Sequence, residues 1–347
     1  MSSFDNIMNK EQYDAARQDQ MPWSEKHRPK NITELVFYNE DIKNKIETLV
    51  ETKSIPHILV SGVPGIGKTT TLRCIANAMY GRFYNDYVLE LNASDNRGIK
   101  TVQIDIINFC KGKKLVHSEG EKATICNKKM VILDEADNMM DKAQAQINTL
   151  MEQYRDSVIF AFTCNESTCI IESIQSRCLI LKYTKYTNKQ MAKRLKQICI
   201  KENVEHDKKI LNEICELSNG DIRVAINYVQ TMFNKYDCLK IEFLSDICNL
   251  PQPLIIKTMF ENSINKKLKR NIELLRTLKQ QGYSYIDIII GMLYTIKSFH
   301  CEEIQNDIKL YLLKKICSTY MQLSKYGAGI SQIHVLALLI DMEQNNE

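Results

Sequence analysis

A glycine-rich stretch, "GVPGIGKT" at residues 62–69, has the residue types and spacing of a phosphate-binding loop. Its glycines let the backbone curl so that N–H groups face an anion, and a hydroxyl can hold Mg²⁺. A chance glycine-rich turn is the alternative, but an apolar run precedes the stretch and helical spacing follows it. The pattern therefore predicts phosphate binding by the loop residues Gly62, Val63, Pro64, Gly65, Ile66, Gly67, Lys68, Thr69 and Thr70.

Two acids end the apolar run of "VILDEAD" (131–137) and supply the chemistry that such a loop lacks. Asp134 would face the Mg²⁺ held by Thr69, and Glu135 would polarise an attacking water. The alternative is a strand followed by the acidic first turn of a helix, which is common. At this distance after a phosphate loop, the pair favours nucleotide hydrolysis.

Two further polar residues fall where a nucleotide site would use them. Asn165 ends an apolar run, and an amide at the carboxyl end of a strand could hold the attacking water. Arg223 sits in the first turn of an expected helix, where the helix dipole disfavours a cation unless an anion lies nearby. A turn residue and an exposed surface arginine are the respective alternatives.

Arg177, in "IESIQSRCLILKY" (171–183), stands where a polar turn gives way to an apolar run. The local pattern gives no reason for a permanent positive charge at that position. Its partner therefore has to be sought elsewhere.

Short apolar runs alternating with helical patterns must position these side chains. Such alternation predicts a parallel sheet with helices on both faces. Beyond residue 184 only helical spacing of apolar residues is found. We expect a flexible tail, an α/β domain, a small helical domain and a second helical domain, at residues 1–20, 21–183, 184–238 and 239–347. The expected strands are residues 57–62, 87–94, 129–137, 158–165 and 178–183.

The composition is that of an ordinary globular protein, with 347 residues, 44% hydrophobic and 25% charged. A net charge of +4 does not by itself argue for nucleic acid. The twelve cysteines form no C-x-x-C pair, which favours reduced, buried thiols. The first residues lack the features of a signal peptide, and the longest apolar run is too short for a bilayer. We expect no membrane partner.

Taken in order, these motifs resemble the AAA+ ATPases, and within them the small subunits of replication factor C, the loader of the ring-shaped sliding clamp. The resemblance extends from about residue 20 to the end of the chain. It rests on the stretches "PWSEKHRP", "GVPGIGKTT", "LELNASDNRGI", "ILDEAD", "FTCN", "IIESIQSRC" and "GDIRVAINYVQ".

The resemblance implies a role for each candidate residue. Ser24, Arg28 and Val36 match positions that surround the adenine and ribose. Asn165 and Arg223 match the two sensors of the nucleotide. Arg177 matches the arginine finger, which acts in trans on the ATP of the adjacent subunit. The catalytic set is then Lys68, Glu135, Asn165 and Arg177, with Thr69 and Asp134 at Mg²⁺.

The resemblance also implies the partners. They are one large and several small AAA+ subunits in a five-membered spiral joined by a collar, the sliding clamp (PCNA), and primer–template DNA in the nucleus. DNA would be held without sequence readout. The candidates for this contact are Arg97, Ile99 and Lys100 at a helix start, and Lys142. Asn148 and Thr149 replace two arginines usual in the family, which leaves their contribution in doubt.

Three alternatives remain beside a hydrolysing clamp-loader subunit. The chain could bind ATP as a structural subunit without productive hydrolysis. It could be another enzyme with a phosphate loop, such as a small-molecule kinase, which would turn over ATP as a monomer. It could also serve a related loader of a checkpoint or cohesion clamp, a role that adds to the first.

Overall fold

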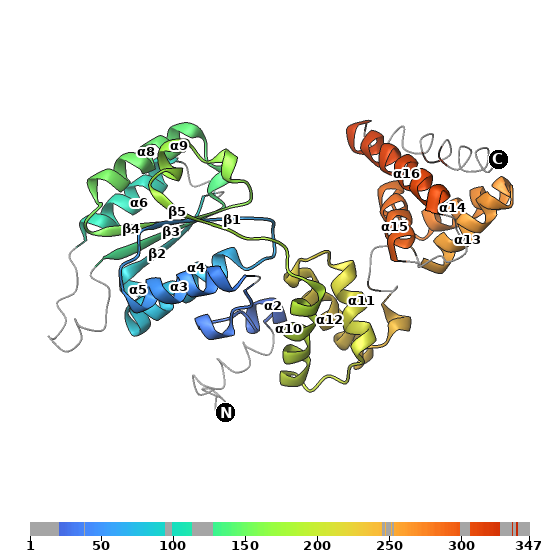
Figure 1. The fold of residues 1–347 in the computed structure, drawn as a ribbon, viewed down its shortest axis with the longest axis horizontal. Coiled ribbons are helices and arrows are strands. Elements are labelled where there is room, and N and C mark those ends of the chain that lie inside the picture. The colour runs from blue at the N-terminus through green and yellow to red at the C-terminus, as the bar shows by residue number, and fades with distance from the viewer. Residues whose placement is uncertain are drawn as a thin grey trace, which may run out of the picture. The chain divides into compact units, whose positions relative to one another are not determined.

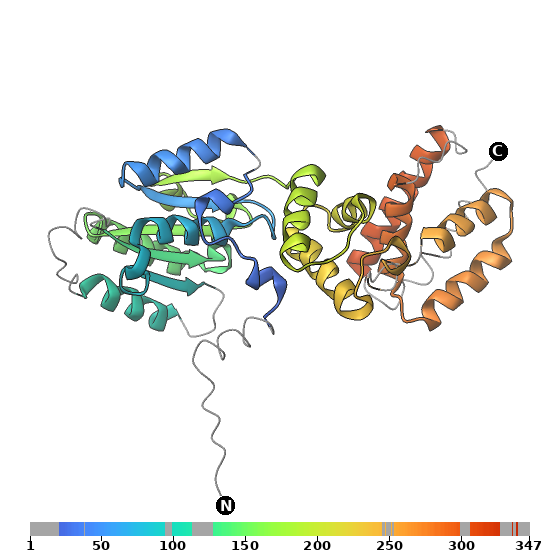
Figure 2. The ribbon, with the colours of Figure 1, turned by 90° about the horizontal axis from the view of Figure 1, so that it is seen from below.

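The computed structural model describes residues 21–37, 39–93, 99–112, 128–244, 247, 251, 253–298, 306–326, 335 and 338. Two compact units divide between Leu239 and Lys240. The predicted N-terminal tail, residues 1–20, lies outside the described residues. The α/β fold class with helical domains after it is confirmed (Figures 1 and 2).

A five-stranded parallel sheet forms the centre of the first unit, in the order β2-β3-β4-β1-β5. All seven residues of β4 and the first five of β3 are buried, because helices cover both faces of the sheet. Each strand falls within a run predicted from the sequence. The strands are β1 (His57–Ser61), β2 (Val88–Asn92), β3 (Lys129–Asp134), β4 (Val158–Cys164) and β5 (Cys178–Lys182).

The helices of the α/β part lie in two layers, one on each side of the sheet (Figure 1). One layer contains α3 (Glu40–Glu51), α4 (Lys68–Tyr80) and α5 (Tyr84–Tyr87). It packs Ile46 and Ile75 against the sheet. The other packs Ile106 and Ile147 against the opposite face. It contains α6 (Ile99–Lys111), α8 (Asp141–Gln153) and α9 (Glu172–Gln175).

Short 3₁₀ turns connect these elements and start the helical part of the second unit. They are η1 (Ile32–Glu34), η2 (Gly81–Phe83), η3 (Ala136–Asn138), η4 (Ser167–Cys169) and η5 (Ile241–Phe243).

Three helices complete the first unit as a lid: α10 (Asn188–Lys201), α11 (Lys208–Leu217) and α12 (Ile222–Tyr236). Side chains in the loops set their starts. Thr187 and Gln190 form a reciprocal capping box at α10, and Asp221 accepts the first free N–H groups of α12.

The short helix α2 (Trp23–Lys26) packs on the lid through Trp23. The backbone N–H of Trp23 donates to Gln230 at 2.9 Å, and its ring contacts Phe233. The N-terminal segment is thereby tied to the lid.

The second unit is all helical where it is described, with α13 (Pro253–Ile264), α14 (Leu268–Gln280), α15 (Tyr285–Ser298) and α16 (Asn306–Tyr326). Its own core is apolar and fully buried, with Met259, Leu278, Ile289, Met292 and Ile316 among its members. Over the part of the chain that the structure describes, no helix has the length and apolarity needed to cross a membrane.

Candidate functional site

The glycine-rich loop joins the end of β1 to the start of α4 and needs glycine at two positions. Gly62 would place a Cβ 2.5 Å from the carbonyl oxygen of Tyr183, and Gly65 would place one 2.0 Å from the carboxylate of Asp221. Gly65 also has φ of +75°, which favours glycine. The loop thus leads into the N-terminus of a 13-residue helix, which offers free N–H groups to an anion.

The side chains of the loop divide between the site and the core. Val63 and Pro64 are exposed, whereas Ile66 is buried in the sheet core. Thr70 is buried in the first turn of α4 and lines the second pocket described below. These positions contribute backbone and packing to the loop.

Lys68 closes the loop from inside. Its ammonium donates to the carbonyl oxygens of Gly62 at 2.5 Å and Val63 at 3.0 Å, and to Oδ1 of Asn165 at 2.9 Å. Burial lowers the pKa of Lys68 from its ordinary value. An anion in the loop would accept from the Lys68 ammonium in place of these oxygens, so the geometry fits a phosphate group.

Asp134 is held at the end of β3 by two hydroxyls. Thr69 donates to both carboxylate oxygens, at 2.8 and 3.0 Å, and Thr163 donates to Oδ1. Thr163 is 1% exposed and was not anticipated from the sequence, because its hydroxyl looks like one more small residue in a buried strand. A carboxylate and a threonine hydroxyl are hard oxygen donors, so this set fits Mg²⁺.

Glu135 follows in a strained conformation, with φ of +56° in the left-handed region. Its backbone N–H donates to Thr163 Oγ1 at 3.0 Å, and Asn138 donates to its Oε2 at 3.3 Å. The exposed carboxylate thus lies beside Asp134 at the carboxyl edge of the sheet. Strain of this kind is concentrated at functional sites.

Asn165 and Lys68 meet directly at this edge. The backbone N–H of Asn165 donates to Asp137 Oδ2 at 2.9 Å, so a third acid fixes the end of β4. Asp137 was missed because an acid in a turn after a strand is common. One pocket is lined by these side chains and the loop: Lys68, Thr69, Asp134, Glu135, Asp137, Thr163, Asn165 and Arg223.

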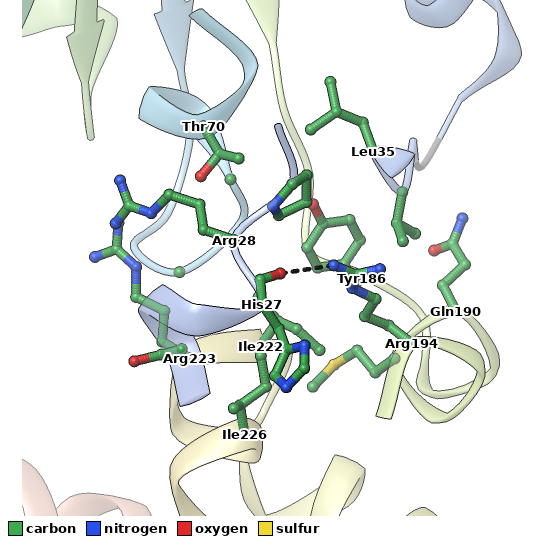
Figure 3. Close-up of a pocket in the computed structure, with 16 residues that line it drawn as sticks. His27, Arg28, Leu35, Thr70, Tyr186, Gln190, Arg194, Ile222, Arg223 and Ile226 are labelled. Atoms are coloured by element: carbon green, nitrogen blue, oxygen red, sulfur yellow. Dashed lines mark hydrogen bonds between the residues drawn. The ribbon is translucent and has the colours of Figure 1, made fainter. Parts of the chain in front are cut away.

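A second, largely apolar pocket is lined by Gly65 and Gly67 of the loop together with residues of the N-terminal segment and the lid (Figure 3). Ser24, Arg28 and Val36, the three residues that the resemblance assigns to the base and ribose of a nucleotide, line this pocket. Arg28 is paired with Glu25 at 2.5 Å. The pocket also contains residues that the sequence did not single out: Leu35, Tyr186, Met191, Arg194, Ile222 and Ile226.

Two of these additional residues join the lid and its linker to the rest of the pocket. Burial raises the pKa of Tyr186 to about 12, and its hydroxyl donates to the Ile66 carbonyl at 2.8 Å. Arg194 donates to the carbonyl of His27 at 2.7 Å, shown as the dashed line in Figure 3. Both contacts run between segments distant in sequence, which is why no local motif announced them.

Arg223 lines both pockets from the first turn of α12. The preceding residue, Ile222, donates its N–H to the Gly65 carbonyl at 3.3 Å. The lid is thus docked on the phosphate loop, and this docking brings Arg223 to both pockets.

Arg177 is the one catalytic candidate that the fold keeps away from both pockets. Arg177 precedes Cys178, which pairs with His57, the first residue of β1. The phosphate loop follows the last residue of β1, at the other end of the strand. Its guanidinium instead donates to the Ser173 carbonyl at 2.9 Å and pairs with Glu152.

The described DNA candidates are at the starts of two helices of the α/β part. Ile99 and Lys100 begin α6, and Lys142 is exposed in the first turn of α8. Arg97 lies outside the described residues. The substituted positions Asn148 and Thr149 are on α8, where Thr149 bonds to the Ala145 carbonyl at 3.1 Å.

Comparison with known proteins places the chain in a family. Residues 58–186 match the model of the ATPase family associated with various cellular activities (AAA), and residues 193–233 match an RCF1/5-like AAA+ ATPase lid domain. Residues 251–339 match the replication factor C C-terminal domain. A Thermotoga maritima structure, titled RuvB Holliday junction branch migration motor, shares the fold, with a TM-score of 0.52 and 20% identity over 67% of this chain and 79% of that one.

Curated relatives share most of their length with this chain. Replication factor C subunit 4 of Saccharomyces cerevisiae is 39% identical over 89% of this chain and 92% of that protein. Replication factor C subunit 2 of Arabidopsis thaliana is 34% identical over 92% of each, and the replication factor C small subunit of Methanococcus vannielii is 34% identical over 93% and 98%.

Fold, site and relatives together define an AAA+ ATPase. Within that class the chain belongs to the replication factor C small subunits, the clamp-loader family of DNA replication. The stretches "LPQPLIIKTMF" and "GYSYIDII" look most like the paralogue called subunit 2 or 4, and several relatives bear those names.

Proposed function

We propose that this chain is an ATP-binding and ATP-hydrolysing small subunit of the heteropentameric clamp loader. The loader would open the sliding clamp (PCNA) and place it on primer–template DNA in the nucleus during replication and repair. The observation that carries the proposal is the gathering of Lys68, Asn165, Asp134 and Glu135 at one edge of the sheet.

The two pockets would bind different parts of ATP. Ser24, Arg28 and Val36 would enclose the adenine and ribose, with Tyr186 supporting the loop beneath. The loop N–H groups and Lys68 would hold the phosphates. Thr69 and Asp134 would hold Mg²⁺, which neutralises phosphate charge when bound.

Hydrolysis would begin with water at Glu135. The carboxylate accepts a proton as the water oxygen approaches the γ-phosphorus, and Asn165 orients the water through its amide. Arg223 on the lid would bind the phosphates, so that their loss on hydrolysis loosens the lid. The bond to ADP breaks as the new P–O bond forms, and phosphate leaves.

Arg177 would complete the active site of the adjacent subunit. Such a cation stabilises charge on the transferred phosphoryl group and is worth roughly 10³–10⁵ in rate. The helices after residue 240 would form the collar, and positive side chains near α6 and α8 would follow the DNA backbone.

Glu135→Gln, in the complex reassembled with its partner subunits, tests hydrolysis. ATP binding to this subunit should persist, while its own share of DNA- and clamp-stimulated turnover disappears, because the amide cannot accept the proton. Glu166→Gln is the matched control, an exposed glutamate next to Asn165.

Unchanged turnover in Glu135→Gln would show that this site is idle and that the chain is a structural ATP-binding subunit. Turnover by the isolated chain on a small acceptor, without dependence on Arg177, would indicate a kinase instead. Failure to associate with any other AAA+ subunit would overturn the assignment to a loader.

A further inference from the structure

Arg177 is held by two contacts on its own chain. One terminal nitrogen of the guanidinium donates to the Ser173 carbonyl at 2.9 Å. The other pairs with the carboxylate of Glu152, near the end of α8. Both side chains are about half exposed, at 39% and 53%. Glu152 is the only acid paired with Arg177 in the part of the chain that the structure describes.

The backbone beneath Arg177 is fixed independently of this pair. Ile174 is fully buried and accepts the Arg177 N–H at 3.1 Å. The buried amide of Gln144, also on α8, accepts the Ile171 N–H at 2.9 Å. The helix α8 therefore anchors the base of α9 through Gln144, and it meets the tip of the arginine through Glu152.

The ion pair contributes little to folding, because exposed pairs are screened by water and require ordering of two long side chains. The ion pair instead orients the guanidinium of Arg177. A guanidinium carries five N–H donors in a rigid fork, and only two of them have partners among the described residues. The remaining donors are enough for a two-pronged contact with a phosphate group.

We propose that Glu152 is the positioning residue of Arg177. It holds one edge of the guanidinium so that the other donors point outward, ready for the phosphates of a nucleoside triphosphate bound to the adjacent subunit. The long side chain of Arg177 is then already ordered when the nucleotide binds. Ordering in advance is how such contacts raise rates. The inference rests on the proposed role of Arg177 in trans.

The test compares Glu152→Gln and Arg177→Ala, singly and together, in the reassembled complex with DNA and clamp. Glu152→Gln removes the charge and keeps the shape. We expect kcat at the adjacent site to fall roughly tenfold, with KM for ATP unchanged. The reason is that the Arg177 guanidinium would be correctly oriented for the transition state a smaller fraction of the time. Glu152→Asp should lose less. Glu172→Gln is the matched control, because it is exposed on the same helix as Ser173 and has no contact with Arg177.

The double variant separates positioning from structure. If Glu152 acts through Arg177, adding Glu152→Gln to Arg177→Ala causes no further loss. An equal loss in both backgrounds, or a rate in Glu152→Gln matching that of Glu172→Gln, would overturn the role of Glu152. Arg177→Ala without effect on the adjacent site would instead overturn the finger itself, so the two failures are distinguishable.

Discussion

Lys68 and Arg177 stand at opposite ends of the same pair of strands. His57 pairs with Cys178 where β1 and β5 begin, and Ser61 pairs with Lys182 where they end. Four residue steps of about 3.3 Å separate the two edges by roughly 13 Å, before the side chains are counted. A single copy of this chain therefore presents a phosphate loop at one edge and a guanidinium at the other.

The first prediction concerns Arg177→Ala. We expect ATP affinity of this chain to stay within about twofold, because Arg177 lines neither nucleotide pocket. Hydrolysis at the adjacent subunit should fall roughly 10³-fold or more. Single-turnover hydrolysis by the reassembled complex measures this.

Two comparisons make that experiment decisive. Arg155→Ala removes another exposed arginine near the same edge and should leave hydrolysis unchanged. In the Arg177→Ala complex, inactivating the adjacent subunit's own loop lysine should cause no further loss of hydrolysis at that subunit. A loss confined to this chain's own site would contradict the assignment.

The sequence predicts more of this site than of its surroundings, for a physical reason. Lys68, Asp134 and Asn165 can be predicted from their positions in the sequence, because chemistry at the carboxyl edge of a parallel sheet needs particular side chains at strand ends. Thr163 and Asp137 act by bonding to those residues, and nothing in their own segments marks that role. The pocket contacts of Tyr186 and Arg194 depend on how the lid docks, which local periodicity does not encode.

The second prediction tests the hydroxyl that the sequence concealed. Thr163→Val keeps the shape of the side chain but leaves Asp134 and the N–H of Glu135 without their shared partner. We expect unfolding to be easier by about 1–3 kcal/mol and hydrolysis to fall more than ATP binding. Urea unfolding and single-turnover assays measure the two effects.

Thr149→Val is the control for that change, since Thr149 is on the exposed face of α8 and its hydroxyl bonds only to the Ala145 carbonyl in the described structure. Equal hydrolysis in the two variants would show that Thr163 does not organise the two acids.

The third prediction uses the close approach of the lid to the loop. Gly65→Ala would bring a methyl group into the carboxylate of Asp221 at a backbone angle that L residues avoid. We expect the lid to be displaced and ATP affinity to fall at least tenfold, measured by equilibrium titration with a fluorescent ATP analogue. Gly282→Ala is matched in strain, with φ of +97°, but its Cβ would meet nothing within 4 Å, so ATP affinity should be unchanged.

A second substitution, at Asp221, tests whether the clash with the lid causes the loss of ATP affinity. Asp221→Ala in the Gly65→Ala background should recover part of the lost affinity, because the carboxylate has gone while the backbone strain remains. No recovery would mean that strain in the loop, and not the lid, controls the affinity.

The last prediction concerns pH and the edge that carries Arg177. Burial, followed by the charges of Lys128, Arg177 and Arg155, lowers the pKa of His57 from 6.5, and its Nδ1 accepts the Phe160 N–H at 3.0 Å. As the pH falls below 6.5 the unfolded chain takes up a proton before the folded one does. The stability contribution of His57 is thus full above that pH and is lost on acidification. His57→Asn should flatten the fall in stability between about pH 7 and pH 5, measured by urea unfolding, and Arg177→Ala should raise the pKa of His57 in NMR titration. A His57 pKa that does not respond to Arg177→Ala would place the guanidinium away from the start of β1 and contradict the geometry on which its action in trans depends.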